Sequence, residues 1–240
     1  MSNLRILKDE ATVSARIRKY NSQPKGADYD RAYHAVLKAR RGKRCLVDDT
    51  GSISEESLQA VKSTLRVFDM DKYMAGNFTA GLKEKLHLDE IKNTLKKFSD
   101  TRVYSLPQTD EVIAQFKAGV RKLYEVLSVE GEDSLDRRSY RFDVGTTKIM
   151  NFLFPELFVI ADRHVRKAVH KSGELHFEKY WDIMMICQGE LQEWREQHHD
   201  FHSFLRLCDF HSLLRLDSGP TTVTRIFDKC AFVMGKNGES

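Results

Sequence analysis

Apolar residues recur every three or four positions through most of this 240-residue chain. Such spacing puts them on one face of an α-helix, whose period is 3.6 residues, and therefore predicts amphipathic helices. Asp28, Ser54 and Asp162 are candidate N-caps, because their side chains can bond the free amides at a helix start. We predict helices over residues 28–40, 54–68, 88–98, 109–127, 146–154, 162–169, 177–194, 201–214 and 222–234.

Alternation of period two, which indicates half-buried β-strands, is nearly absent, so the predicted fold class is all-α. The length fits a single helical domain over residues 1–240, and no internal repeat is visible. Residues 130–138 form a polar, charged connector. This connector is the one predicted boundary at which the domain could divide into two lobes flanking a cleft.

The basic residues are more informative in their distribution than in their sum, because the net charge is only +4. Lysine and arginine concentrate in two stretches, residues 38–44 and 163–171. Either stretch fits contact with nucleic-acid phosphates, and either fits a solvated helix face.

The four cysteines, Cys45, Cys187, Cys208 and Cys230, are far apart and form no C-x-x-C pair. Buried free thiols in a reducing compartment are the simplest interpretation. The first residues lack the apolar stretch of a signal peptide, and no run approaches the roughly 18 apolar residues of a membrane span. We therefore expect a cytoplasmic protein with no membrane partner.

One segment, residues 141–169, combines several features that chemistry could use. Gly145 is predicted to form a turn that a side chain would forbid, and the amides of Thr146 and Thr147 would then attract a phosphate. An apolar connector follows and places Asp162 at the edge of the core, where a low dielectric constant strengthens its field. The alternatives are an ordinary helix start after Gly145 and a purely structural N-cap at Asp162.

The order of motifs in this segment resembles the core of the helix-hairpin-helix DNA glycosylase superfamily. In bacterial proteins with an 8-oxoguanine-glycosylase-type fold, a Gly-x-x-Lys hairpin helix precedes Pro-x-Leu-Phe and then an aspartate that opens the next helix. The matching stretches here are Val144-Gly145-Thr146-Thr147-Lys148, Pro155-Glu156-Leu157-Phe158, Asp162-Arg163-His164-Val165 and, like the closing helix of that group, Thr224-Arg225-Ile226-Phe227-Asp228-Lys229. The likeness covers about residues 140–235.

The resemblance implies an enzyme that bends double-stranded DNA, flips a damaged or modified nucleotide into a pocket, and hydrolyses its N-glycosidic bond. As the base leaves, the sugar becomes cationic, and a fixed carboxylate stabilises that charge, as in glycoside hydrolysis. The resemblance gives this role to Asp162, which can cap a helix at the same time. Some bacterial glycosylases of this kind act against phages with modified DNA, so antiviral defence is implied by the same analogy.

Lys148 matches the lysine with which bifunctional members of the family attack the sugar and form a Schiff base. Two departures weaken that assignment. Lys148 and Asp162 are closer in sequence than the corresponding pair usually is, and the hairpin lacks the family's leucine-proline-glycine opening. We therefore expect a monofunctional enzyme, and a phosphate contact or a structural role for Lys148 is an equal alternative.

The predicted contacts with DNA are phosphate contacts, which position a protein without reading sequence. They comprise Gly145, Thr146 and Thr147 in the hairpin and the basic residues Arg40, Arg41, Lys43, Arg44, Arg163 and Arg166. Candidates for stacking a flipped base are Tyr140, Phe142, Trp181 and Trp194, although aromatic residues at helical spacing more often belong to a core. No metal or organic cofactor is expected, and the protein is predicted to be a monomer.

Other interpretations stay open. His198, His202, Cys208 and His211 have metal-ligand spacings, but no H-E-x-x-H or paired-cysteine motif accompanies them, which favours a polar turn or a DNA-facing loop. The main rival to an enzyme is a helix-hairpin-helix module that grips nucleic acid without chemistry. A helical adaptor with no nucleic-acid role is a third interpretation.

Overall fold

The computed structural model describes residues 5–40, 45–70, 78–106, 109–128, 142–197 and 222–238, and the predicted all-α class is confirmed. Within these ranges the only extended pairing is an isolated bridge between Val47 and Ile53. The helices are α1 (Glu10–Asn21), α2 (Gly26–Ala39), α3 (Glu55–Val67), α4 (Phe78–His87), α5 (Asp89–Phe98), the 3₁₀ helix η2 (Val103–Ser105), α6 (Asp110–Ser128), α7 (Asp143–Leu153), α8 (Arg163–Ala168), α9 (Phe177–Gln197) and α11 (Val223–Asn237).

Several helix starts follow the predicted caps. The Ser54 hydroxyl accepts the amide of Ser57 at 3.1 Å and caps α3. Asp162 caps α8, as its position in the sequence predicts. The cap predicted at Asp28 is wrong, because α2 begins at Gly26 and Asp28 lies in its first turn, where a negative charge favours the helix dipole.

Helices α1 and α4 lie outside the predicted set. In α1 only Val13, Ile17 and Tyr20 are buried, and in α4 only Leu82 and Leu86. Such narrow apolar stripes give a weak periodic signal within a charged sequence. Packing stabilises both helices, since α1 lies against α11 and α4 lies against α3 and α5.

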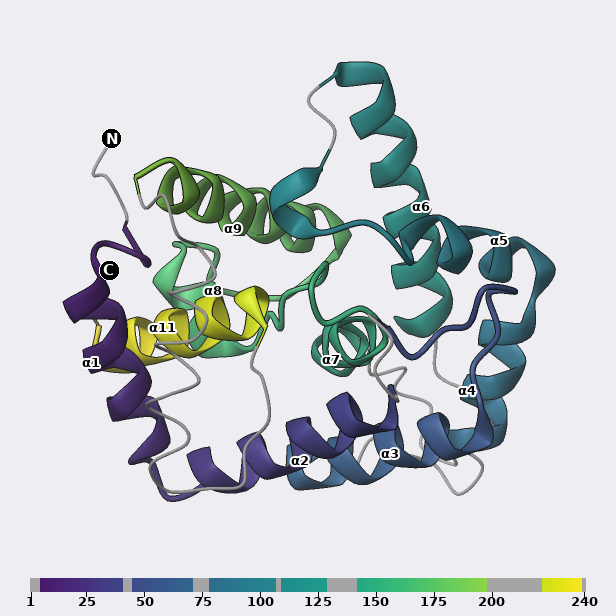
Figure 1. The fold of residues 1–240 in the computed structure, drawn as a ribbon, viewed down its shortest axis with the longest axis horizontal. Helices are drawn as coiled ribbons and strands as arrows, with labels where there is room; N and C mark the ends of the chain where they lie inside the picture. Colours follow the sequence, from purple (N-terminus) through teal and green to yellow (C-terminus); the bar gives the residue numbers. More distant parts are fainter. Residues whose placement is uncertain are drawn as a thin grey trace.

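Helix α7 is the central element of the fold and is seen end-on in the middle of Figure 1. Every residue of α7 except Val144 is buried, including the polar residues Thr146, Thr147 and Lys148. Its neighbours include α2, α3 and α6. Asp143, Thr147 and Asn151 follow helical spacing and form a polar stripe, yet they are buried like the rest of the helix.

A second group of helices packs beside α7, with α11 lying against α8 and α1. The contact between α11 and α8 is so close that a side chain at Gly235 would collide with the carbonyl of His164. In Figure 1 this group lies to the left of α7, and α4, α5 and α6 lie to its right. Helices α2 and α3 run along the lower edge of the same view and link the two groups.

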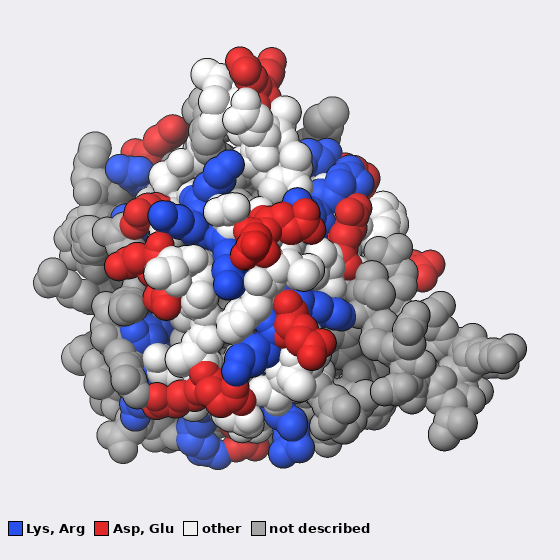
Figure 2. Space-filling model, turned by 90° about the vertical axis from the view of Figure 1, so that its right-hand side faces the viewer, with Lys and Arg blue, Asp and Glu red and all other residues white. Residues whose placement is uncertain are grey.

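The end of the molecule that carries α4, α5 and α6 has acidic and basic side chains intermixed (Figure 2). Lys83 pairs there with Glu55, and Lys122 pairs with Glu90. Phosphate backbones bind surfaces with a local excess of positive charge. A nucleic-acid interface is therefore not expected at this end.

Cys45, Cys187 and Cys230 are buried free thiols, as predicted, and Cys208 lies outside the described residues. The connector predicted at residues 130–138 and the helix predicted over 201–214 also lie outside them. Among the helices that the structure describes, none combines the length and the apolar character needed to span a bilayer.

Candidate functional site

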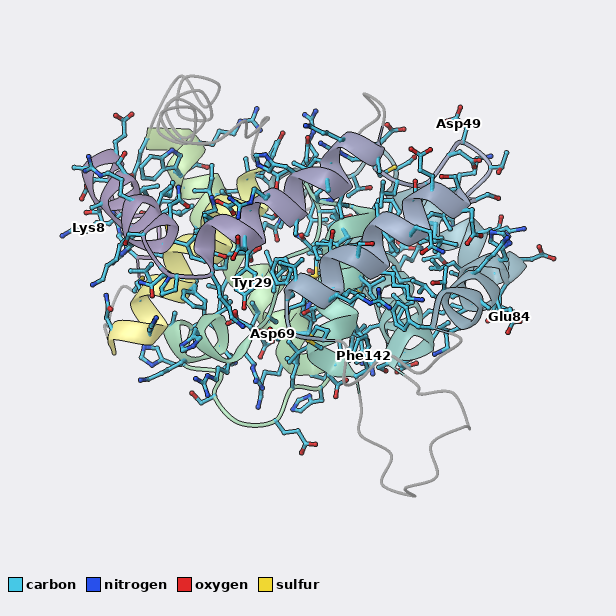
Figure 3. The ribbon with its side chains drawn as sticks, turned by 90° about the horizontal axis from the view of Figure 1, so that it is seen from below. Lys8, Tyr29, Asp49, Asp69, Glu84 and Phe142 are labelled. Atoms are coloured by element: carbon cyan, nitrogen blue, oxygen red, sulfur yellow. The ribbon has the colours of Figure 1, made fainter. Side chains whose placement is uncertain are left out.

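A cavity of about 480 Å³ lies between the α1–α2 corner, the end of α3, α7, and the α8–α11 pair. Its volume is typical of small-molecule sites. Two of its wall residues, Tyr29 of α2 and Asp69 after α3, lie next to each other near the middle of the view in Figure 3. The cavity also contains both residues that the sequence singled out for chemistry, Asp162 and Lys148.

Asp162 lies half-buried at the edge of this cavity and caps α8 with one of its two carboxylate oxygens. Its Oδ1 accepts the amides of His164 at 2.8 Å and Val165 at 2.9 Å. No hydrogen bond among the described residues involves Oδ2. The cap fixes the orientation of the carboxylate, and it leaves one oxygen available to a ligand.

The connector that leads to Asp162 turns at residues 155–157 and is then held from several sides by buried side chains. The Thr147 hydroxyl of α7 accepts the amide of Ala161 at 3.2 Å, and Asp228 of α11 accepts the amide of Ile160 at 3.1 Å. Tyr180 of α9 donates to the carbonyl of Val159 at 3.3 Å. Because buried amides and carbonyls need partners, these bonds fix the position of the connector and of Asp162, which follows it.

Lys148 reaches the cavity from α7 with only 7% of its surface exposed. Its ammonium lies 3.4 Å from the carbonyl of Phe68, at the C-terminal end of α3, and 4.9 Å from the centre of the Phe68 ring. Burial lowers the pKa of Lys148 to about 8, and the charges of Asp162 and Asp69 offset part of that effect. The amine therefore changes protonation close to neutral pH.

A buried ion network that includes two cavity-lining residues, Tyr20 and Arg225, joins α11 to α1 and α2. Arg225 donates to the Tyr20 hydroxyl at 2.6 Å and to Asp30 at 3.1 Å, and Lys229 donates to Asp30 at 2.6 Å. Burial alone would raise the pKa of Asp30, but Lys229 and Arg225 outweigh it and hold that pKa below its usual value. Asp30 thus stays ionised, and the network fixes Arg225 in place.

Asp228 lies one helical turn after Arg225 and has a different environment. Its side chain is buried, Oδ1 bonds the amide of Ile160, and Oδ2 has no partner among the described residues. Burial raises the pKa of Asp228 well above its ordinary value, although Arg225 acts in the opposite direction. This environment therefore favours the protonated, neutral form of the carboxyl group.

Aromatic rings form two walls of the cavity. Tyr29 stacks on Phe68 with ring centres 4.6 Å apart, and His164 lies 4.6 Å from Phe232. Tyr20 meets Phe232 edge to face at 5.4 Å. Flat apolar walls of this kind suit a flat aromatic ligand, because stacking on aromatic side chains stabilises any nucleobase.

The charges around the cavity are mainly positive. Lining it are the basic side chains of Lys25, Lys148, Arg163, Arg225 and Lys236 and the acidic side chains of Asp69, Asp162 and Asp228. Lys25 pairs with Asp69 at 2.6 Å, and this bond lowers the pKa of Asp69. The basic side chains outnumber the acidic ones, so positive charge exceeds negative charge here, which favours an anionic ligand.

The glycine turn predicted at Gly145 is wrong, because this residue lies inside α7. Glycine is required there for space: a side chain would collide with the ring of Phe142. The amide of Thr146 bonds the carbonyl of Phe142 at 2.7 Å, and the Thr147 hydroxyl bonds the connector. Gly145, Thr146 and Thr147 are buried and cannot meet a phosphate in this structure, so the predicted phosphate contact at these three residues is wrong.

The structure places only some of the basic residues predicted to contact phosphate at or beside the cavity. Arg163 is exposed and lines the cavity, and Arg166 lies on the next turn of α8, where it bonds the carbonyl of Gly173. Arg40 ends α2 and does not line the cavity. The other three of the first stretch, Arg41, Lys43 and Arg44, lie outside the described residues.

The aromatic candidates from the sequence do not line the cavity. Phe142, Trp181 and Trp194 are buried core residues, and Tyr140 lies outside the described residues. The same holds for the possible metal ligands His198, His202, Cys208 and His211. Among the residues that are described, no cluster of three or more His, Cys, Asp or Glu could hold a metal ion.

Sequence reasoning missed most of the cavity, including Arg225 and Asp228. One signal was present: residues 225, 228, 232 and 236 follow helical spacing along one face of α11 and are mostly charged. A polar stripe on a helix that is otherwise apolar indicates a lined cavity or a buried network. Tyr29 and Phe68 gave no such signal, because they meet only through tertiary packing.

Comparisons of the chain with protein-family models, with curated proteins and with solved structures found no match. The likeness to helix-hairpin-helix glycosylases therefore rests on the motifs quoted from the sequence.

Proposed function

We propose that this protein is a DNA glycosylase, which flips a damaged or modified base out of double-stranded DNA and hydrolyses its N-glycosidic bond. One observation carries the proposal: Asp162, whose Oδ2 is unpartnered among the described residues, and Lys148, whose pKa is about 8, line the same aromatic-walled cavity. A lysine with a strongly perturbed pKa that shares a cleft with a carboxylate is typical of catalytic sites. We further propose that it acts as a monomer in the cytoplasm, with antiviral defence as one setting.

In the proposed reaction the bond between C1′ of the sugar and the nitrogen of the base breaks, and the bonding electrons leave with the base. Asp162 stabilises the sugar cation through Oδ2 and orients a water molecule, whose oxygen bonds C1′ and whose proton is released. Lys148 in its ammonium form gives a proton to the departing base, a role for which a pKa near the working pH is best. The products are a free base and an abasic site.

The geometry favours this proposal over a binding module without chemistry. Such a module would have no need for a lysine whose charge is partly desolvated. We retain the monofunctional mechanism because Lys148 can serve as an acid without forming a Schiff base.

The decisive variant is Asp162→Asn. Asparagine caps helices as well as aspartate does, so the fold should persist while the charge is lost. We expect base release to fall by a factor of about 10²–10³ and DNA binding to persist. Release can be measured by mass spectrometry of bases freed from genomic DNAs that carry different modifications.

Asp9→Asn is the matched control, because Asp9 caps α1 through the amide of Thr12 and does not line the cavity. It makes the same chemical change at another helix start and should leave release unaltered. Equal activity of Asp162→Asn and the wild type would refute the catalytic role, and no affinity for DNA at low salt would refute the proposal as a whole.

A further inference from the structure

Two buried polar atoms at the cavity lack partners among the described residues, and both belong to α11. They are Oδ2 of Asp228 and Nε of Arg225. Asp228 is 2% exposed and Arg225 is 3% exposed, and both line the cavity. Buried polar groups without partners are uncommon and costly in native proteins, and at a cavity wall a ligand can supply the missing bonds.

We propose that Asp228 and Arg225 together select a ligand edge that presents two neighbouring hydrogen-bond acceptors. The two residues are three positions apart on α11, so their side chains project from the same face of the helix. The choice of a nucleobase as the ligand rests on the proposed function. The pair adds to Asp162 and Lys148 because it selects the base, whereas those two residues take part in breaking the bond.

Arg225 is a donor in every state, since guanidinium has N–H groups and no acceptor. Its Nη2 is already committed to Tyr20 and Asp30, which hold the planar group still and leave Nε–H as the free donor. A donor that is fixed in place loses little entropy when it binds a ligand, and it discriminates sharply between acceptors and donors.

Asp228 can also donate, because its environment favours the protonated carboxyl group. Oδ1 accepts the amide of Ile160, so the proton belongs on Oδ2, the oxygen without a partner. An ionised carboxylate with one unpaired oxygen would be costly in a site this buried. Burial accordingly raises the pKa of Asp228 well above its ordinary value despite the nearby Arg225.

A ligand edge that bonds both donors must present two acceptors, and this requirement distinguishes the bases. Guanine presents two acceptors, O6 and N7, in its major-groove edge, and hypoxanthine shares them. Adenine presents N7 beside an amino group, which would place a donor against a donor. Hypoxanthine and adenine share the purine ring and the N7 acceptor and differ at position 6 and in the proton on N1, so they form a closely matched pair of probes.

The experiment measures binding of free hypoxanthine and free adenine to the full chain at pH 7 by calorimetry. We expect hypoxanthine to bind about tenfold more tightly or better, in keeping with the discrimination of a two-bond base contact. Equal affinity, or tighter binding of adenine, would overturn the proposal. An Arg225 variant is avoided, because Arg225 also belongs to the buried ion network.

Asp228→Asn gives a second test. Ile160 requires an acceptor, so the amide nitrogen of asparagine should occupy the Oδ2 position and donate as the protonated acid does. The preference for hypoxanthine should stay within about twofold of wild type, whereas Asp228→Val should lose it about tenfold. If Asp228→Val does not fold, the asparagine variant still decides: a wild-type preference for adenine that Asp228→Asn turns toward hypoxanthine shows that Asp228 is ionised and accepts, and overturns the proposal.

The two proposals fail in different ways. A protein that releases bases from DNA but binds hypoxanthine and adenine equally lacks the selective pair and remains a glycosylase. A protein that prefers hypoxanthine but releases no base from any DNA has the selective pair and is not a glycosylase.

Discussion

Lys148 is the clearest case in which a side chain costs the fold stability and is needed for the proposed reaction. A lysine on a helix surface keeps its charge in water, but Lys148 is enclosed by α3, α7 and the connector and its pKa is about 8. The carbonyl and ring of Phe68 and the charge of Asp162 offset only part of the lost hydration. The buried ammonium therefore costs the fold stability, and the proposed role as an acid would account for its presence.

The rate of base release should report the protonation of Lys148. If the ammonium form is the acid, single-turnover rates are constant below pH 8 and fall as the pH rises through about 8, because the proton is then lost. Lys148→Met should be slower and should lack this limb of the profile. A rate that rises through pH 8, together with a borohydride-trapped adduct, would instead identify the neutral amine as a nucleophile.

Replacing Lys148 should increase the stability of the fold, although it should slow base release. Because the folded-state pKa lies below that of the unfolded chain, the ammonium form destabilises the fold at pH 7. Lys148→Met should raise the free energy of unfolding by about 1–3 kcal/mol in urea titrations at pH 7. The gain should shrink between pH 8 and pH 10.5 as the wild-type amine becomes neutral in the folded protein. A less stable variant would mean that the contacts of the ammonium outweigh its burial.

At the scale of elements, the connector of residues 154–162 is as important as the helices. It makes few backbone–backbone hydrogen bonds. Side chains from α7, α9 and α11 instead provide partners for its amides and carbonyls. Thr147 and Asp228 bond the two residues that directly precede Asp162. The position of the carboxylate is thus set by three helices that are far apart in sequence.

Thr147→Val tests this positioning role. The change keeps the shape of the side chain but leaves the amide of Ala161 without a partner, which should cost about 1–3 kcal/mol of stability. A small displacement of Asp162 should also lower the single-turnover rate of folded enzyme by about 10–100-fold, with DNA binding retained.

The control for this variant is Thr64→Val, which removes another buried hydroxyl that donates to the carbonyl of Ala32 at 3.0 Å, away from the connector. It should affect stability alone. A Thr147→Val enzyme that loses stability but keeps its rate would limit Thr147 to a structural role.

Sequence pattern predicted the elements better than it predicted the site. Most described helices, the cap at Ser54 and the cap at Asp162 follow from local rules of spacing and amide bonding. The burial of Thr147 and the pairing of Asp30 with Arg225 do not, because they depend on which helices meet. Gly145 illustrates the limit: glycine was expected for a turn, and the fold requires it for lack of space beside Phe142.

At the scale of the whole molecule, charge is arranged unevenly about α7. The α4–α6 end mixes both signs (Figure 2), whereas the cavity on the other side of α7 has a positive excess. A DNA duplex should therefore approach from the side of α8 and α11, with its backbone near exposed cations such as Arg163 and Lys236. If DNA binds in this orientation, the cations on this face alone should determine how strongly salt weakens DNA binding.

The double variant Arg163→Gln, Lys236→Gln tests the orientation. If about three phosphates are contacted, affinity for DNA should fall about 40-fold between 50 and 200 mM salt, and removing two of the cations should reduce the slope of log K against log salt by about two. Lys83→Gln, Lys122→Gln is the matched control, because it changes the net charge equally at the mixed end of the molecule. Its slope should equal that of the wild type in fluorescence anisotropy titrations. If both double variants lower the slope equally, the whole surface attracts DNA without a preferred face, and the cavity has no privileged access to the duplex.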